Sequence, residues 1–305
     1  MPEPSRWYYM RVKNLIISDQ IWVARAIQNA IIRLMRYETL QNVTLPKIGF
    51  GTWRIGGEGS PDPTQEARSL AALRSALELG YTHFDTAEAY AAGHAEELLG
   101  QAIHSSGLSR ADLFITSKVS PEHLGYIDVL RSYANSLRRL EMDYLDLYLI
   151  HWPGRGIPMA DTFRALNLLV KEGKVRHLGV SNFNLKLLQE AMSQSETPIF
   201  TNQVSYSIPD RTSVENGVLA YCQQHDILLT AYSPVKRRFI SGNQPLQELA
   251  NRRGVTSQQI ALAWLVRQPG VIAIPMSFNP QHQAENLAAA DLVLTEDDLA
   301  QFLRV

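Results

Sequence analysis

Hydrophobic and polar positions follow two alternating patterns from about residue 45 to the end of the chain. Short, mostly apolar runs typical of buried strands are followed by longer segments whose apolar residues recur every three or four positions, as on one face of a helix. The strand-like runs lie at 48–53, 82–87, 113–118, 145–152, 176–182, 200–206, 227–233 and 271–277. Strands that alternate with helices favour a parallel sheet, and eight of them can close a barrel. We therefore expect an α/β fold, a single-domain (β/α)8 TIM barrel.

Local signals refine this expectation. Helical periodicity is clear over 67–79, 95–104, 127–140 and 162–171. Two further helices are expected within 243–268, broken near Gly254, with Thr256 as the N-cap of the second. The segment 39–45 predicts a small hairpin at the bottom of the barrel, and the acidic residues after Thr295 predict the start of a terminal helix.

The first 37 residues do not share the alternation. Within 21–37, apolar residues lie on most faces, with three arginines and no acidic residue. Three interpretations are open: sequence translated upstream of an effective start at Met35, an additional helix packed on the barrel, or a targeting or membrane-surface segment. We favour the first, because recognisable structure begins near Glu38. The expected domains are therefore an extension over 1–37 and a barrel over 38–305.

Composition narrows the class of protein. The chain has 305 residues, 45% of them hydrophobic and 19% charged, which is typical of a soluble globular domain. A net charge of -1 offers no basic field for nucleic acid, and no apolar run is long enough to span a membrane. The single cysteine, Cys222, excludes an internal disulfide and fits a reducing compartment. We expect a cytoplasmic, monomeric protein without a nucleic-acid or membrane partner.

Candidate chemistry lies at the ends of successive strand-like runs. Asp85 lies near the end of the second run and Tyr90 just past it, Lys118 ends the third, and His151 lies at the end of the fourth. Such ends converge on one face of a parallel barrel. Tyr90 could act as a general acid whose pKa Lys118 lowers, while Asp85 could orient Lys118. His151 could donate a hydrogen bond to a substrate oxygen. Because no side chain supplies hydride, the set predicts an oxidoreductase with a cofactor.

Four segments carry a more specific signal. DTAEAY (85–90), TSKV (116–119), LYLIHWP (147–153) and GVSNF (179–183) together resemble the aldo-keto reductase superfamily, in its prokaryotic type with short substrate loops. The resemblance implies a (β/α)8 barrel and reversible hydride transfer from NAD(P)H to an aldehyde or ketone. It also implies a catalytic tetrad with Tyr90 as the acid, formed by Asp85, Tyr90, Lys118 and His151.

The resemblance implies a cofactor site at the later strand ends as well. A hydroxyl and two amides would bind the nicotinamide carboxamide, and an aromatic ring would stack on the nicotinamide. The residues implied are Ser181, Asn182 and Gln203 for the carboxamide, Tyr232 for the ring, Ser233 for the pyrophosphate, and Ser277, His282, Glu285 and Asn286 for the adenosine end.

The chain departs from the family pattern where the 2'-phosphate of NADPH is held. Many relatives carry Lys immediately before the serine that corresponds to Ser277, and Arg five residues after that serine. This chain has Met276 and His282 at these positions. Lys236, Arg237 and Arg238 could reach the phosphates from the other side, although a solvated loop is an equal interpretation of this triplet. We expect NADP(H) to be favoured narrowly over NAD(H).

The loop after His151, PGRGIPMAD, is short, so the resemblance implies an open substrate pocket that includes Trp53 and Trp152. Two other functions are open. One is a catalytically weak nucleotide-binding regulatory subunit. The other is a metal-dependent hydrolase, which is disfavoured because His83 lacks a partner with metal-ligand spacing. We expect no metal.

Overall fold

The computed structural model describes residues 37–302. Its main sheet has eight parallel strands that pair in chain order. These are β3 (Phe50–Gly51), β4 (His83–Asp85), β5 (Phe114–Val119), β6 (Leu145–Ile150), β7 (Val175–Ser181), β8 (Ile199–Ser205), β9 (Leu228–Tyr232) and β10 (Val271–Ala273). A parallel bridge between Ile48 and Ala273 joins the two ends of this order, so the sheet closes on itself. The eight predicted strands and the (β/α)8 barrel are confirmed.

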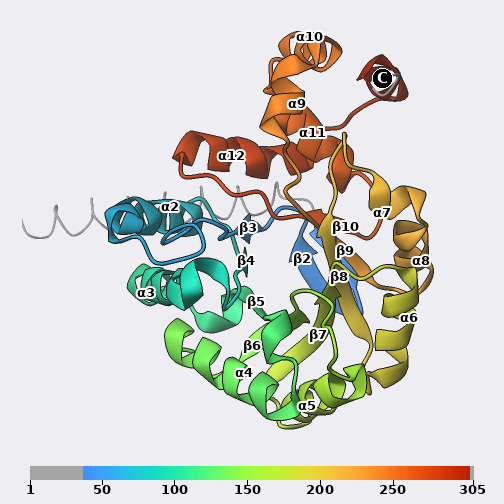
Figure 1. Ribbon diagram of the computed structural model, residues 1–305. Coiled ribbons are helices and arrows are strands. Elements are labelled where there is room, and N and C mark those ends of the chain that lie inside the picture. The colour runs from blue at the N-terminus through green and yellow to red at the C-terminus, as the bar shows by residue number, and fades with distance from the viewer. Residues whose placement is uncertain (1–36, 303–305) are drawn as a thin grey trace, which may run out of the picture.

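Helices surround the barrel (Figure 1). They are α2 (Glu66–Glu78), α3 (His94–Ser106), α4 (Tyr126–Leu140), α5 (Met159–Lys171), α6 (Leu185–Gln194), α7 (Thr212–Glu215), α8 (Val218–Gln224), α9 (Arg237–Gly242), α10 (Gln244–Arg253), α11 (Ser257–Val266), α12 (Pro280–Ala288) and α13 (Glu296–Phe302). The predicted break near Gly254 is confirmed, since Gly254 has a φ of 65° and Thr256 forms a capping box with Gln259.

A hairpin covers the amino-terminal end of the barrel, as predicted. β1 (Tyr37–Leu40) and β2 (Val43–Pro46) pair antiparallel. The Gln41 side-chain amide donates to the carbonyl oxygens of Ile199 and Asp226, at the start of β8 and just before β9. Leu45 packs on the side chains that fill this end of the barrel, namely Leu147, Leu149, Phe200, Leu228 and Ile272.

The segment 1–37 lies outside the described residues except for Tyr37, which begins β1. The three interpretations of this segment therefore stay predictions. Between residues 37 and 302, no helix is long and apolar enough to cross a bilayer.

Candidate active site

The predicted tetrad comes from three adjacent strands. Asp85 is the last residue of β4, Lys118 is the penultimate residue of β5, and His151 directly follows β6. Tyr90 lies five positions beyond Asp85, at the start of a short 3-10 segment, Tyr90–Gly93. Because parallel strands end at the same edge, sequence positions from 85 to 151 meet at the carboxyl end of the barrel.

Lys118 is the centre of this group and is fully buried. Its Nζ donates to Asp85 Oδ1 at 2.5 Å, to the Thr86 carbonyl oxygen at 2.7 Å and to Tyr90 Oη at 3.4 Å. An ammonium group has three hydrogens, so these three oxygens satisfy it. Burial lowers the pKa of Lys118, but the charge of Asp85 and the contacts with Asp85 and Tyr90 outweigh burial and raise it overall. Lys118 is therefore a permanent positive charge beside the phenol.

The phenol of Tyr90 stays protonated at neutral pH. Burial raises its pKa above the ordinary value, while Lys118 acts in the opposite direction and Asp85 again raises it. The expectation that Lys118 favours the phenolate is correct in sign, but burial is the larger effect. Tyr90 can consequently donate a proton, and the phenolate that remains would face the Lys118 ammonium.

His151 lies beside Tyr90, with 5.5 Å between the ring centroids. Burial, together with the charge of Lys118, lowers the pKa of His151 to about 3. The imidazole is therefore neutral and carries one N–H donor. The Trp53 ring centroid is 5.2 Å from that of Tyr90, and the Trp53 and Trp152 side chains remain 47% and 48% exposed. One exposed tryptophan therefore lies beside Tyr90, and another directly follows His151 in the chain.

The predicted carboxamide set is joined by hydrogen bonds. Ser181 Oγ donates to the Gln203 carbonyl oxygen at 2.9 Å, and Asn182 Nδ2 donates to Ser181 Oγ at 3.0 Å and to the His151 carbonyl oxygen at 3.1 Å. Tyr232 Oη donates to Asn182 Oδ1 at 2.9 Å. Asn182 adopts a φ of 64°. Hydroxyl and amide groups that can both donate and accept suit a carboxamide, so the donor set fits a nicotinamide group.

One contact was not expected from the sequence. Gln203 Nε2 donates to Asp85 Oδ2 at 2.7 Å, and both residues are almost completely buried. β4 and β8 are not neighbours in the sheet, so this hydrogen bond crosses the barrel interior. It joins the predicted carboxamide set to the predicted tetrad. The only signal in the sequence is that both residues lie near the carboxyl ends of their strands, at positions expected to face the barrel interior. Whether they meet depends on the register of the strands, which sets how far each residue lies along the barrel axis.

The predicted adenosine set lies in the β10–α12 loop and on α12. Ser277 Oγ accepts from the Asn279 backbone N–H at 3.1 Å, and Glu285 Oε1 accepts from Gln281 Nε2 at 2.9 Å. Asn286 is nearly buried, whereas His282 is exposed. Neither Met276 nor His282 brings a permanent charge to this loop.

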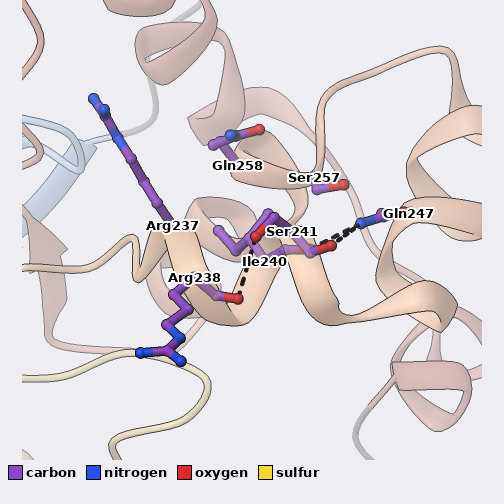
Figure 2. Close-up of a pocket in the computed structure, with 7 residues that line it drawn as sticks. All are labelled: Arg237, Arg238, Ile240, Ser241, Gln247, Ser257 and Gln258. Atoms are coloured by element: carbon purple, nitrogen blue, oxygen red, sulfur yellow. Dashed lines mark hydrogen bonds between the residues drawn. The ribbon is translucent and has the colours of Figure 1, made fainter.

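The basic triplet is not a loop, because Arg237 and Arg238 form the first turn of α9 and Lys236 is its N-cap. A hollow of about 370 Å³ opens beside this turn, lined by Arg237, Arg238, Ile240, Ser241, Gln247, Ser257 and Gln258. Figure 2 shows the two arginine side chains extending in different directions from α9. In the described part of the chain, neither forms an ion pair with a carboxylate. No group of three or more metal-ligating side chains occurs among residues 37–302.

Comparisons with known proteins place most of this chain in one family. The model of the aldo/keto reductase family matches residues 47–305. Methylglyoxal reductase YeaE of Escherichia coli is 37% identical over 265 residues, with 85% of this chain and 90% of that protein covered. Glyoxal reductase of Bacillus subtilis is 37% identical over 257 residues, with 84% of this chain and 87% of that protein covered.

Solved structures are similar as well. The thermostable aldo-keto reductase Tm1743 matches with a TM-score of 0.82 at 43% identity, covering 87% of this chain and 98% of its own. An aldo/keto reductase from Klebsiella pneumoniae, in complex with NADP and acetate, matches with a TM-score of 0.79 at 39% identity, covering 88% and 94%.

The chain therefore belongs to the aldo/keto reductase family. It is an NAD(P)H-dependent oxidoreductase of carbonyl compounds, and the predictions of family, fold and reaction class are confirmed.

Proposed function

We propose that this protein reduces small aldehydes and ketones, with Tyr90 as the general acid and NADPH narrowly preferred to NADH. One observation carries the proposal: Lys118 Nζ donates at once to Asp85 and to the phenol of Tyr90. A buried permanent cation beside a protonated phenol is an arrangement suited to proton donation.

The proton comes from Tyr90 Oη. Burial keeps this phenol protonated in the ground state, so it is available to a carbonyl oxygen placed between Tyr90 and His151. As the proton leaves, negative charge grows on Oη at 3.4 Å from the Lys118 ammonium, which stabilises it in a low-dielectric site. Neutral His151 donates its N–H to the same carbonyl oxygen and orients it.

The nicotinamide cofactor supplies the hydride when bound. Ser181, Asn182 and Gln203 would hold its carboxamide, and Tyr232 would contact the ring. Several of their polar groups are paired with one another in this structure, so binding exchanges internal hydrogen bonds for bonds to the cofactor. Ser233, Ser277, His282, Glu285 and Asn286 complete the proposed cofactor site.

Small 2-oxoaldehydes are the proposed substrate class. Two relatives are named methylglyoxal reductase and glyoxal reductase. Trp53 and Trp152 are about half exposed, and the loop between His151 and α5 is short, so an open pocket fits a compact, polar aldehyde better than a bulky one.

NADPH is proposed because two similar Klebsiella pneumoniae structures contain NADP or NADPH, while Met276 and His282 make the preference narrow. A cytoplasmic location and a monomeric state are proposed on composition alone.

The test follows loss of the reduced-nicotinamide absorbance with purified protein, a panel of aldehydes and ketones, and NADPH and NADH in parallel. Aldehyde-dependent oxidation of NADPH, fastest with 2-oxoaldehydes, is the expected result. Tight nucleotide binding without turnover of any carbonyl would instead favour the regulatory-subunit alternative. Faster turnover with NADH would reverse the cofactor preference.

A further inference from the structure

The loop that follows β10 is a natural place for a phosphate in this barrel. β9 and β10 are the seventh and eighth strands of the closed sheet, and barrels often bind phosphate in the loops after these strands and at a nearby helix N-terminus. Asn279 caps α12 by accepting from the Gln281 backbone N–H at 2.9 Å. Ser277 also lies in this loop. Yet Met276 is uncharged, histidine is not a permanent cation, and residues 274–288 contain no lysine or arginine, so the segment itself lacks a permanent cation.

A buried glutamine fixes helix α2 against this loop. Gln283 Nε2 donates to the Ala72 carbonyl oxygen of α2 at 3.0 Å and to the Ser277 carbonyl oxygen at 2.8 Å. Tyr81 Oη donates to the Gln283 carbonyl oxygen at 2.9 Å. Gln283 is fully buried, and Figure 1 shows α12 running alongside α2. The distance between α2 and the β10–α12 loop is therefore set by these buried hydrogen bonds.

Arg68 is the cation that this packing brings to the loop. It lies four residues before Ala72, on the same face of α2. Its guanidinium carbon is 4.2 Å from the ring centroid of Phe278, the residue after Ser277. In the described part of the chain, Arg68 has no carboxylate partner, whereas Arg110, Arg139 and Arg253 are all paired with acidic side chains. Stacking on Phe278 orients the planar guanidinium and leaves its N–H donors available.

We propose that Arg68 binds the 2'-phosphate of NADPH and thereby determines the preference for NADPH over NADH. The proposal rests on the proposed function of a nicotinamide-dependent reductase. The cation comes from α2 in place of the charges that residues 276 and 282 lack. Guanidinium groups match phosphate oxygens in a bidentate manner, so one oriented arginine is sufficient to discriminate.

The test measures binding of two cofactor fragments, 2',5'-ADP and 5'-AMP, by calorimetry. Only the first carries the 2'-phosphate. Arg68→Ala is expected to weaken the binding of 2',5'-ADP about tenfold or more, as the loss of one charged hydrogen-bonded contact implies. The affinity for 5'-AMP should not change. Arg68→Lys should restore part of the difference. Reductase activity with NADH should survive in Arg68→Ala, while the KM for NADPH rises.

Arg164→Ala is the matched control. Arg164 stacks on Tyr126 at 4.4 Å and also forms an exposed ion pair with Asp161 at 3.4 Å, and its helix α5 lies across the barrel from α12 in Figure 1. This variant removes an equivalent surface cation–π contact and should not change either affinity.

Three results would overturn the proposal. Equal losses of affinity for both fragments in Arg68→Ala would show that Arg68 is a packing residue. If Arg68→Ala still binds 2',5'-ADP more tightly than 5'-AMP to the same degree as the wild type, and Arg237→Ala or Arg238→Ala loses this difference, the 2'-phosphate binds at α9. Failure of the wild-type protein to bind any nucleotide would remove the cofactor proposal itself, which distinguishes that failure from the failure of Arg68 alone.

Discussion

Gln203 and Asp85 are joined by a hydrogen bond of 2.7 Å from Nε2 to Oδ2, while the other oxygen of Asp85 accepts from Lys118. One amide therefore contacts the ion pair behind Tyr90 and also belongs to the proposed carboxamide site. We therefore expect occupation of that proposed site and the orientation of Tyr90 to be coupled through the Gln203 side chain.

We predict that Gln203→Leu will lower both cofactor affinity and kcat. The substitution leaves a buried carboxylate oxygen without its donor, at a cost of about 1–3 kcal/mol. Loss of kcat at saturating cofactor, in addition to weaker binding, is the signature of the contact to Asp85. The measurement is single-turnover reduction with NADPH bound at saturation. Asn167→Leu is the control, because it removes a buried amide that bonds Gln194 and Glu196. A kcat unchanged in Gln203→Leu would confine that residue to cofactor binding.

Tyr90→Phe should bind NADPH normally and lose about 10²–10⁴-fold in carbonyl reduction, the usual contribution of a positioned acid. The ring, its contact with Trp53 and its packing against His151 all remain. Tyr133→Phe is the control, because its phenol donates to the Lys174 carbonyl oxygen. The two variants are compared by steady-state rates and by nucleotide titration. Wild-type turnover in Tyr90→Phe would remove Tyr90 from the role of acid.

The expected pH dependence of turnover follows from two pKa shifts of opposite direction. Burial raises the pKa of Tyr90, and burial with the charge of Lys118 lowers the pKa of His151 to about 3. Neither group changes protonation between about pH 5 and pH 8. Reduction needs the protonated phenol, so kcat should be flat over this range and fall only as pH approaches the raised pKa. Alcohol oxidation needs the phenolate and should rise with pH. A clear inflection of kcat near pH 6.5 would contradict the neutral state assigned to His151.

Much of this molecule could be predicted from its sequence because its signals are local. Eight apolar runs and the periodic segments between them define the strands and helices, and four polar residues at strand ends define the candidate tetrad. The contact between Gln203 and Asp85 could not be predicted, since it depends on the height of β8 relative to β4 across the barrel. The sequence does not show that Arg237 and Arg238 lie in a helix, because α9 is short and carries no strong periodicity.

The buried pair of Glu96 and Arg139 is a further case of information absent from the sequence pattern. Glu96 lies on α3 and Arg139 on α4, and their contact arises only when the two helices pack. Glu96 Oε2 accepts from Arg139 Nε at 2.7 Å, and Oε1 accepts from Ser117 Oγ at 2.5 Å. Burial raises the pKa of Glu96, although Arg139 lowers it.

We predict that Arg139→Ala will lower the free energy of unfolding by about 3–5 kcal/mol at pH 7, because it leaves a fully buried carboxylate without its counter-ion. Without Arg139, the folded-state pKa of Glu96 rises further above its unfolded value, so the folded form takes up a proton and recovers stability as pH falls through that window. The double variant Glu96→Gln with Arg139→Met, which removes both charges, should lose much less. Urea unfolding of the three proteins at pH 7 and pH 5 tests this. A loss below about 1 kcal/mol in Arg139→Ala, or one independent of pH, would show that Glu96 is already protonated in the native protein.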